Sequence, residues 1–236
     1  AADIYDRPDS YADNRVLAPD AANEGKVVTQ LLWADDADLS DMPKTGNLST
    51  LLDATVAEHN GVFCAQLGTE NGYIIVSDTG SEAKAGLTSF DPRVRSWYTN
   101  AKDKGALTWS DLVEDGYGRG LGIVCTNPVY DNSGSFRGVA GVSLLLSELS
   151  DTISNEDLGS TSYAFAIDSS GQTVIMPDLK TLSDRVNLLE AKDPAVREMA
   201  QKMADGETGV AQITLYGKEV YAAYAPLTAI NWSICT

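Results

Sequence analysis

Three short turns that end in glycine each separate two strand-like runs, and they constrain the fold of this chain more than any other feature. The turns are Thr69-Glu70-Asn71-Gly72, Asp131-Asn132-Ser133-Gly134 and Asp168-Ser169-Ser170-Gly171. Asn and Asp side chains hydrogen-bond to nearby backbone groups, and glycine adopts the positive φ angles that tight turns require. The sequence therefore predicts antiparallel hairpins at these three places.

The order strand, strand, helix, strand, strand, strand occurs twice along the chain. The first round has strands at 62–67, 73–77, 107–109, 122–130 and 136–146, with helices at 48–59 and 91–104. The second round has strands at 163–167, 173–176, 210–215, 220–225 and 231–235, with a helix at 193–204. We therefore predict an α+β fold of two modules, each an antiparallel five-stranded sheet with flanking helices.

These elements predict four segments. Residues 1–47 form an N-terminal helical or irregular segment, 48–146 the first module, 147–158 a connecting helix and 159–236 the second module. Within the first segment, apolar residues following Pro19 and including Val28 and Leu32 have a spacing that indicates a helix.

The charge of the chain excludes several classes of partner. Its 34 acidic and 17 basic residues give a net charge of −17, which argues against nucleic acid and anionic membrane surfaces. No phosphate loop or metal-ligand cluster is present, so no cofactor is expected. Cys64 and Cys125 lie in separate apolar runs, which allows either two buried free thiols or a disulfide between them.

A cluster of aromatic and basic residues at Phe90-Asp91-Pro92-Arg93-Val94-Arg95-Ser96-Trp97-Tyr98 indicates a binding pocket. The guanidinium of Arg95 offers a planar set of donors for a carboxylate, and Trp97 and Tyr98 offer rigid walls for a small molecule. We expect Arg95 and Tyr98 to share one face of the helix that Pro92 begins. The alternatives are a surface role for Arg95 and plain core packing for the two aromatic residues.

This cluster resembles the signature of the double Cache (dCACHE) family of bacterial extracytoplasmic sensor domains. The resemblance continues through Pro128-Val129-Tyr130-Asp131 and Gly138-Val139-Ala140-Gly141-Val142, and together it covers about residues 48–236. It implies two Cache (PAS-like) modules, the first distal to the membrane and the second proximal to it. The membrane spans of such a receptor would lie outside this chain.

The resemblance also implies roles for individual residues. In amino-acid-binding members the matching arginine and tryptophan hold the ligand carboxylate, which gives that role to Arg95 and Trp97. Tyr98 matches a pocket aromatic, and Asp115 falls where a downstream aspartate is expected. Three positions depart from the family pattern: Phe90 and Val113 replace residues that are often tyrosine, and Ser143 replaces the aspartate that pairs with the ligand ammonium. A carboxylate ligand with a less cationic far end therefore fits this sequence better than an ordinary amino acid.

The sequence thus predicts the extracytoplasmic ligand-sensing domain of a bacterial transmembrane signalling receptor. Its expected ligand is a small carboxylate-bearing or amino-acid-like molecule bound in the distal module. No nucleophile motif occurs around a serine or cysteine, so the domain itself is not expected to be an enzyme. Such receptors commonly act as homodimers. The alternative is a ligand-free structural or dimerisation spacer in such a receptor.

Overall fold

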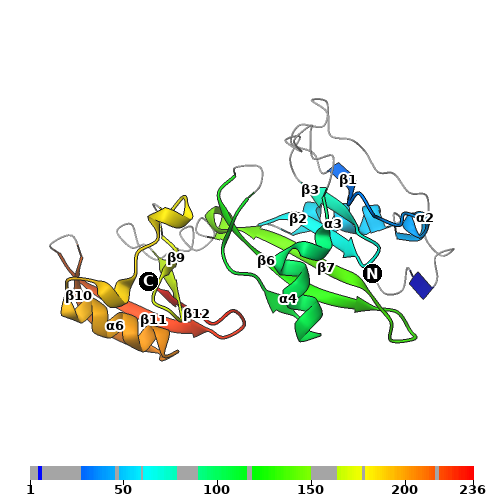
Figure 1. Cartoon of the computed structure of the whole chain (residues 1–236). Coiled ribbons are helices and arrows are strands. Elements are labelled where there is room, and N and C mark those ends of the chain that lie inside the picture. Colours follow the sequence, from blue (N-terminus) through cyan, green and yellow to red (C-terminus); the bar gives the residue numbers. More distant parts are fainter. Residues whose placement is uncertain are drawn as a thin grey trace. The chain divides into compact units, whose positions relative to one another are not determined.

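The fold was taken from a computed structural model of the whole chain (Figure 1). The structure describes residues 5–6, 28–45, 48–59, 61–78, 90–115, 119–149, 164–176, 179–215 and 218–236. The chain separates into two compact units, and the main division falls between Leu145 and Leu146. Residues 112–115 and 119–121 group with the second unit, and the rest of the described chain before Leu146 forms the first.

The first sheet is antiparallel and has seven strands in the order β1-β3-β2-β7-β6-β4, with β5 paired to β6 off this path. The strands are β1 (Val28–Trp33), β2 (Val62–Thr69), β3 (Tyr73–Asp78), β4 (Thr108–Trp109), β5 (Val113–Glu114), β6 (Leu121–Tyr130) and β7 (Phe136–Leu145). All five strands expected for this module are present. β1 and β5 make the sheet larger than the five strands that the sequence predicts.

The expected helix that was to include Val28 and Leu32 is wrong in the described residues, because residues 28–33 form β1. Every residue of β1 is paired with a residue of β3, from Val28 opposite Asp78 to Trp33 opposite Tyr73. Apolar residues occur on both faces of this strand, so the alternation that distinguishes a strand from a helix is missing. The remainder of that expected helix lies outside the described residues.

Helices lie on opposite faces of the first sheet. On one face, α3 (Ser49–Glu58) contributes Leu52 and Val56 to a core that also contains Ala65 and Leu67 of β2. On the other face lie the 3₁₀ helix η4 (Pro92–Val94) and α4 (Ser96–Lys104), which pack over Gly68 and Val139. We call these two sides of the sheet the α3 face and the α4 face. Figure 1 shows both helices beside this sheet.

The second sheet confirms the expected five antiparallel strands, in the order β10-β11-β12-β8-β9. The strands are β8 (Phe165–Asp168), β9 (Thr173–Ile175), β10 (Gly209–Leu215), β11 (Lys218–Leu227) and β12 (Trp232–Cys235). The helix α6 (Pro194–Ala204) begins after Asp193, whose carboxylate accepts from the Ala195 N–H as an N-cap. Met199, Ala200 and Met203 of α6 lie in the core of this unit.

Short helices complete the described chain: α2 (Met42–Thr45) in the first unit, and the 3₁₀ helices η5 (Leu182–Asp184) and η6 (Leu188–Glu190) in the second. Residues 146–149 are helical, and the rest of the expected connecting helix lies outside the described residues. The three predicted turns are confirmed. Gly72, Gly134 and Gly171 have φ angles of 87°, 80° and 81°, which glycine adopts without strain.

Candidate functional site

The helix predicted over residues 91–104 is interrupted at Arg95. The Asp91 carboxylate caps the 3₁₀ helix η4 by accepting from the Arg93 N–H at 2.9 Å. Arg95 is extended, with φ −86° and ψ 139°, and α4 begins after it. The expectation that Arg95 and Tyr98 share one helical face is therefore wrong, because Arg95 is exposed and Tyr98 is buried. The predicted end of the helix is confirmed, since Gly105 caps it in the left-handed conformation.

Arg95 lies over the Phe90 ring, with its Cζ 4.5 Å from the ring centroid. Within the described ranges, no carboxylate forms a hydrogen bond or ion pair with its guanidinium. The Asp91 carboxylate is held instead by Arg93, whose Nε and Nη2 donate to it at 2.9 Å. Arg93 therefore makes a structural salt bridge. Arg95 presents an exposed cation whose donors remain available to an anion.

Trp97 and Tyr98 occupy different environments although they are adjacent. Trp97 is half-buried and packs with Phe90 against the cluster of Cys64, Ile74 and Val76 on the α4 face. Tyr98 is 1% exposed, and its hydroxyl donates to the Glu70 carboxylate at 2.8 Å. Burial and that carboxylate raise the pKa of Tyr98 well above its usual value. The structure therefore places Tyr98 in the core and Trp97 at its margin.

Ser143 lies in a row of residues that crosses the α4 face of the sheet. Cys64 on β2 is opposite both Ser143 on β7 and Asp78 on β3, and Ser143 is also opposite Val124 on β6. Residues that face each other across antiparallel strands point to the same side of the sheet. Ser143 is 7% exposed, so it is a buried hydroxyl on the face that carries Phe90 and Trp97.

Sequence reasoning missed three buried polar residues on this face. Gln30 and Gln66 lie in the next row, each opposite Val76, and Asp78 ends β3. They are 6%, 8% and 3% exposed, respectively. A signal was present, because each glutamine interrupts an apolar strand run and buried polar groups need partners. Their shared face depends on strand register, which the sequence alone did not provide.

Asp115 and Val113 group with the second unit, whereas Arg95 belongs to the first. The Asp115 carboxylate is held by Arg119, with Nε 2.9 Å from Oδ2 and Nη2 3.0 Å from Oδ1. Its side chain is 5% exposed. Val113 is half-buried on β5. Both oxygens of the Asp115 carboxylate thus already accept hydrogen bonds from the guanidinium of Arg119.

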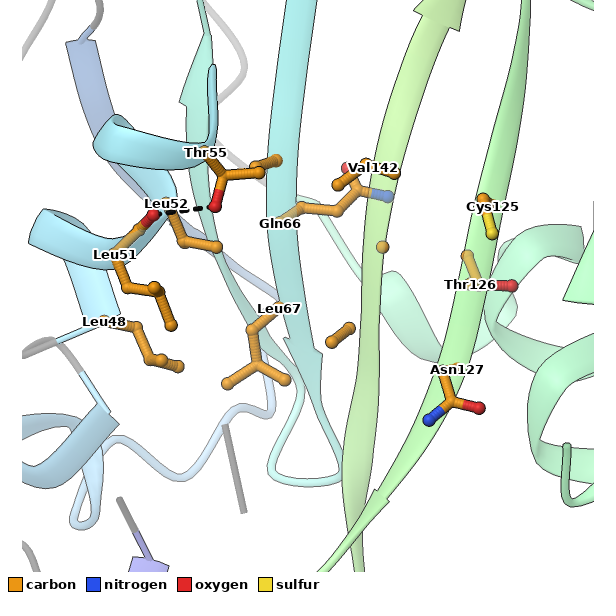
Figure 2. Close-up of a pocket in the computed structure, with 13 residues that line it drawn as sticks. Leu48, Leu51, Leu52, Thr55, Gln66, Leu67, Cys125, Thr126, Asn127 and Val142 are labelled. Carbon is orange, nitrogen blue, oxygen red and sulfur yellow. Dashed lines mark hydrogen bonds between the residues drawn. The ribbon is translucent and has the colours of Figure 1, made fainter. Parts of the chain in front are cut away.

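A recess of about 290 Å³ lies on the α3 face (Figure 2). Figure 2 shows Leu48, Leu51 and Leu52 on one side of it and Cys125 and Asn127 of β6 on the other. Carbon atoms form most of its surface, and none of its lining side chains carries a charge. A carboxylate placed there would lose its hydration without a cation to replace it. The recess suits apolar groups.

The cysteines are free thiols. Cys64 shares the α4 face with Ser143, whereas Cys125 is opposite Val142 and so points to the α3 face. The two side chains therefore lie on opposite sides of one sheet. This arrangement excludes a disulfide between Cys64 and Cys125, so both are free thiols. Within the described part of the chain, no group of three or more His, Cys, Asp or Glu residues could hold a metal ion.

Comparison with known proteins identifies the family. The dCache_1 family model, described as the Cache domain, matches residues 22–236. The chain belongs to the Cache domain family. This confirms the resemblance in the signature around Arg95 and Trp97, and it extends the match to residues before the predicted first module. The two antiparallel sheets are those of a two-module Cache architecture.

Curated relatives of this Cache chain include the voltage-dependent calcium channel subunit alpha-2/delta-2 of mouse and of human. The mouse protein is 28% identical over 160 residues, which is 56% of this chain and 14% of that protein. The human protein is 28% identical over 149 residues, or 56% of this chain and 13% of that protein. The chain thus spans about a seventh of the length of these relatives.

Solved Cache structures share the fold. The ligand-binding domain of the Pseudomonas fluorescens chemoreceptor CtaA, in complex with L-serine, has a TM-score of 0.59 and 23% identity, covering 81% of this chain and 78% of that one. The corresponding domain of the Pseudomonas aeruginosa PAO1 chemoreceptor PctC, in complex with GABA, has a TM-score of 0.56 and 19% identity, with the same coverage. An extracellular domain assigned to the histidine kinase mmHK1S-Z2 has a TM-score of 0.55 and 17% identity, covering 79% and 78%.

The Cache family consists of sensor domains of signalling proteins, and in its fold this chain resembles chemoreceptor ligand-binding domains. Among the described residues, no helix has both the length and the apolar character needed to span a bilayer.

Proposed function

We propose that this Cache chain is the extracytoplasmic ligand-sensing domain of a bacterial transmembrane receptor. Its ligand is a small carboxylate-bearing or amino-acid-like molecule bound by the first unit, on the α4 face of the sheet. The observation that carries this proposal is Arg95, an exposed guanidinium that lies over Phe90 beside Trp97 and has no carboxylate partner in the described chain.

The surroundings of Arg95 favour an anion as its partner. The chain has a net charge of −17, and several of its cations, including Lys102 and Arg137, pair with carboxylates. Arg93 is an example, since it binds both Asp91 and Asp36. Arg95 instead faces an aromatic ring, which holds the guanidinium through cation–π attraction without occupying its donors. A ligand carboxylate can then form a bidentate pair with it.

Trp97 and Ser143 complete the proposed site. The half-buried indole of Trp97 offers an apolar wall for the body of the ligand, and Ser143 offers a hydroxyl on the sheet beneath. Phe90 supports Arg95, and Tyr98 supports Trp97 from the core through an edge-to-face contact at 5.7 Å. Asp115 and Val113 belong to the second unit and have no part in this proposal for the first.

The proposed mechanism is a shift between two conformations of the domain. A ligand that binds one conformation more tightly increases its population, and the change passes to membrane spans outside this chain. The second unit lies nearer the membrane in this proposal, and the receptor acts as a homodimer. A sensor module that binds no ligand and acts only as a spacer is the competing function.

A thermal-shift screen distinguishes these two functions. The purified domain is heated with members of a panel of short carboxylates and amino acids at millimolar concentration. A binding domain gains stability as RT ln(1 + [L]/Kd), so its Tm rises with ligand concentration for at least one carboxylate. Binding by uncharged analogues but by no carboxylate would contradict the proposed role of Arg95. No shift with any compound would favour the spacer.

A further inference from the structure

The first sheet contains a buried donor that no described residue satisfies. The side-chain amide nitrogen of Gln30 is shielded from solvent and has no hydrogen-bond partner, in a residue that is 6% exposed. An unpaired buried N–H has lost its hydration without compensation, so such groups are rare in native proteins and call for an explanation.

Gln30 points to the face that carries the proposed site. Its neighbour Thr29 points to the α3 face, where its hydroxyl donates to Asp53 of α3 at 2.6 Å. Successive side chains of a strand alternate between faces, so Gln30 is on the α4 face. There it lies opposite Val76, which packs in one cluster with Phe90 and Trp97. The unpaired amide and Arg95 therefore border the same cluster.

The group that satisfies this amide must accept a hydrogen bond, and its charge is restricted by Asp78. On β1 and β3, Gln30 is the diagonal neighbour of Asp78, which is 3% exposed and already has an interaction partner in the protein. A second carboxylate on the ligand would be repelled by this buried acid. An ammonium group would be attracted by Asp78, but it has no lone pair to accept the amide hydrogen and would leave the buried nitrogen unpaired. An uncharged oxygen meets both conditions.

We propose that Gln30 donates a hydrogen bond to an uncharged oxygen of the ligand, at the end remote from Arg95. The ligand class is a small carboxylate that carries a second, uncharged oxygen as a hydroxyl, carbonyl or amide group. This inference deepens the proposed function and rests on it, because the carboxylate end is assigned to Arg95. It agrees with Ser143, which places a buried hydroxyl on the same face.

A matched ligand series tests the class of the remote group. Butyrate, 4-hydroxybutyrate, GABA and succinate differ only in the group at the far end, and shorter and longer homologues of each extend the series. Isothermal titration at neutral pH is expected to give the tightest binding for the hydroxyl compound at the preferred chain length. We expect it to bind about tenfold more tightly than the methyl and ammonium compounds. Tightest binding of the ammonium or dicarboxylate member would overturn the inference.

Variants of Gln30 test whether this residue causes the preference. Gln30→Met keeps the shape without the polar group, so it should bind the hydroxyl and methyl compounds equally while raising the Tm of the free domain. A hydroxyl preference that survives Gln30→Met would show that the amide does not act as proposed.

Two controls separate the possible failures. Gln30→Asn retains a shortened amide, and circular dichroism confirms that each variant is folded. If Arg95→Ala abolishes binding of all members but Gln30→Met leaves the hydroxyl preference intact, only the present inference fails. If no carboxylate of the series binds the wild type, the proposed function fails and this inference fails with it.

Discussion

Gly68 of β2 lies directly beneath Trp97, so that a Cβ atom on this glycine would stand 2.7 Å from Cη2 of the indole. The same atom would be 2.8 Å from Cβ of Pro92, at the start of η4. The glycine therefore lets the segment that contains Arg95 and Trp97 approach the sheet closely. The position of the proposed site depends on this contact.

The substitution Gly68→Ala is expected to destabilise the domain by about 1–3 kcal/mol, because an added methyl group overpacks a tight contact. Urea denaturation followed by fluorescence measures the change. Trp97→Phe shortens the ring at the point of contact, so the double variant should lose less stability than the sum of the single variants. Strict additivity of the two changes would contradict the contact.

Tyr98 is expected to support stability without touching the ligand. Tyr98→Phe removes a buried hydroxyl and leaves the Glu70 carboxylate with Lys102, whose Nζ is 2.7 Å from Oε1. The free energy of unfolding should fall by about 1 kcal/mol while ligand affinity changes less than twofold. A large loss of affinity in a fully folded variant would return Tyr98 to the ligand pocket that the family resemblance implies.

Much of the fold could be predicted because its signals are local. The three glycine turns and the capped helices α4 and α6 each depend on a few adjacent residues. The helical spacing at β1 is misleading because Leu31 and Leu32 pack in clusters on opposite faces of the sheet, which leaves no alternation to detect. The break at Arg95 has no local signal, because an N-cap followed by proline begins a 3₁₀ turn as readily as an α-helix.

The candidate site could be predicted only in part, for a related reason. Arg95, Trp97 and Phe90 are close in sequence, so a local pattern revealed them. Gln30 and Asp78 join them only through the pairing of β1 with β3 and of β3 with β2. Strand register depends on contacts between distant parts of the chain, and a shift of one residue would move both side chains to the other face.

The thiols should differ in reactivity, because Cys125 is half-exposed whereas Cys64 and Cys235 are 6% and 1% exposed. Iodoacetamide should therefore label Cys125 first in the native domain, as peptide mass spectrometry can measure. Burial raises the pKa of Cys125, so Cys125 should be labelled more slowly than a fully solvent-exposed cysteine, such as that of a short peptide, at the same pH. Equal labelling of all three thiols in the native domain would contradict their burial.

Asp131 should make stability depend on pH in the acidic range. Hydrogen bonds from Ser133 and Ser135, together with Arg137, lower the pKa of this carboxyl from 3.8 to about 2. A lowered folded-state pKa means that the stabilisation is complete above about pH 4 and is lost as pH falls towards 2. Asp131→Asn lacks this charge, so the stability difference from the wild type should shrink on acidification. A difference that stays constant between pH 5 and pH 2 would contradict this assignment.

The proposed site is tested most directly by the affinity of Arg95→Ala for the carboxylate that stabilises the wild type best, measured by isothermal titration. Lys104→Ala, which removes an exposed cation from the end of α4, controls for the general change in charge. We expect at least a hundredfold loss of affinity for Arg95→Ala, in line with the roughly 3 kcal/mol of a charged hydrogen-bonded pair, and little change for Lys104→Ala. Equal affinities of Arg95→Ala and the wild type, with the variant fully folded, would contradict the central claim that Arg95 binds the ligand.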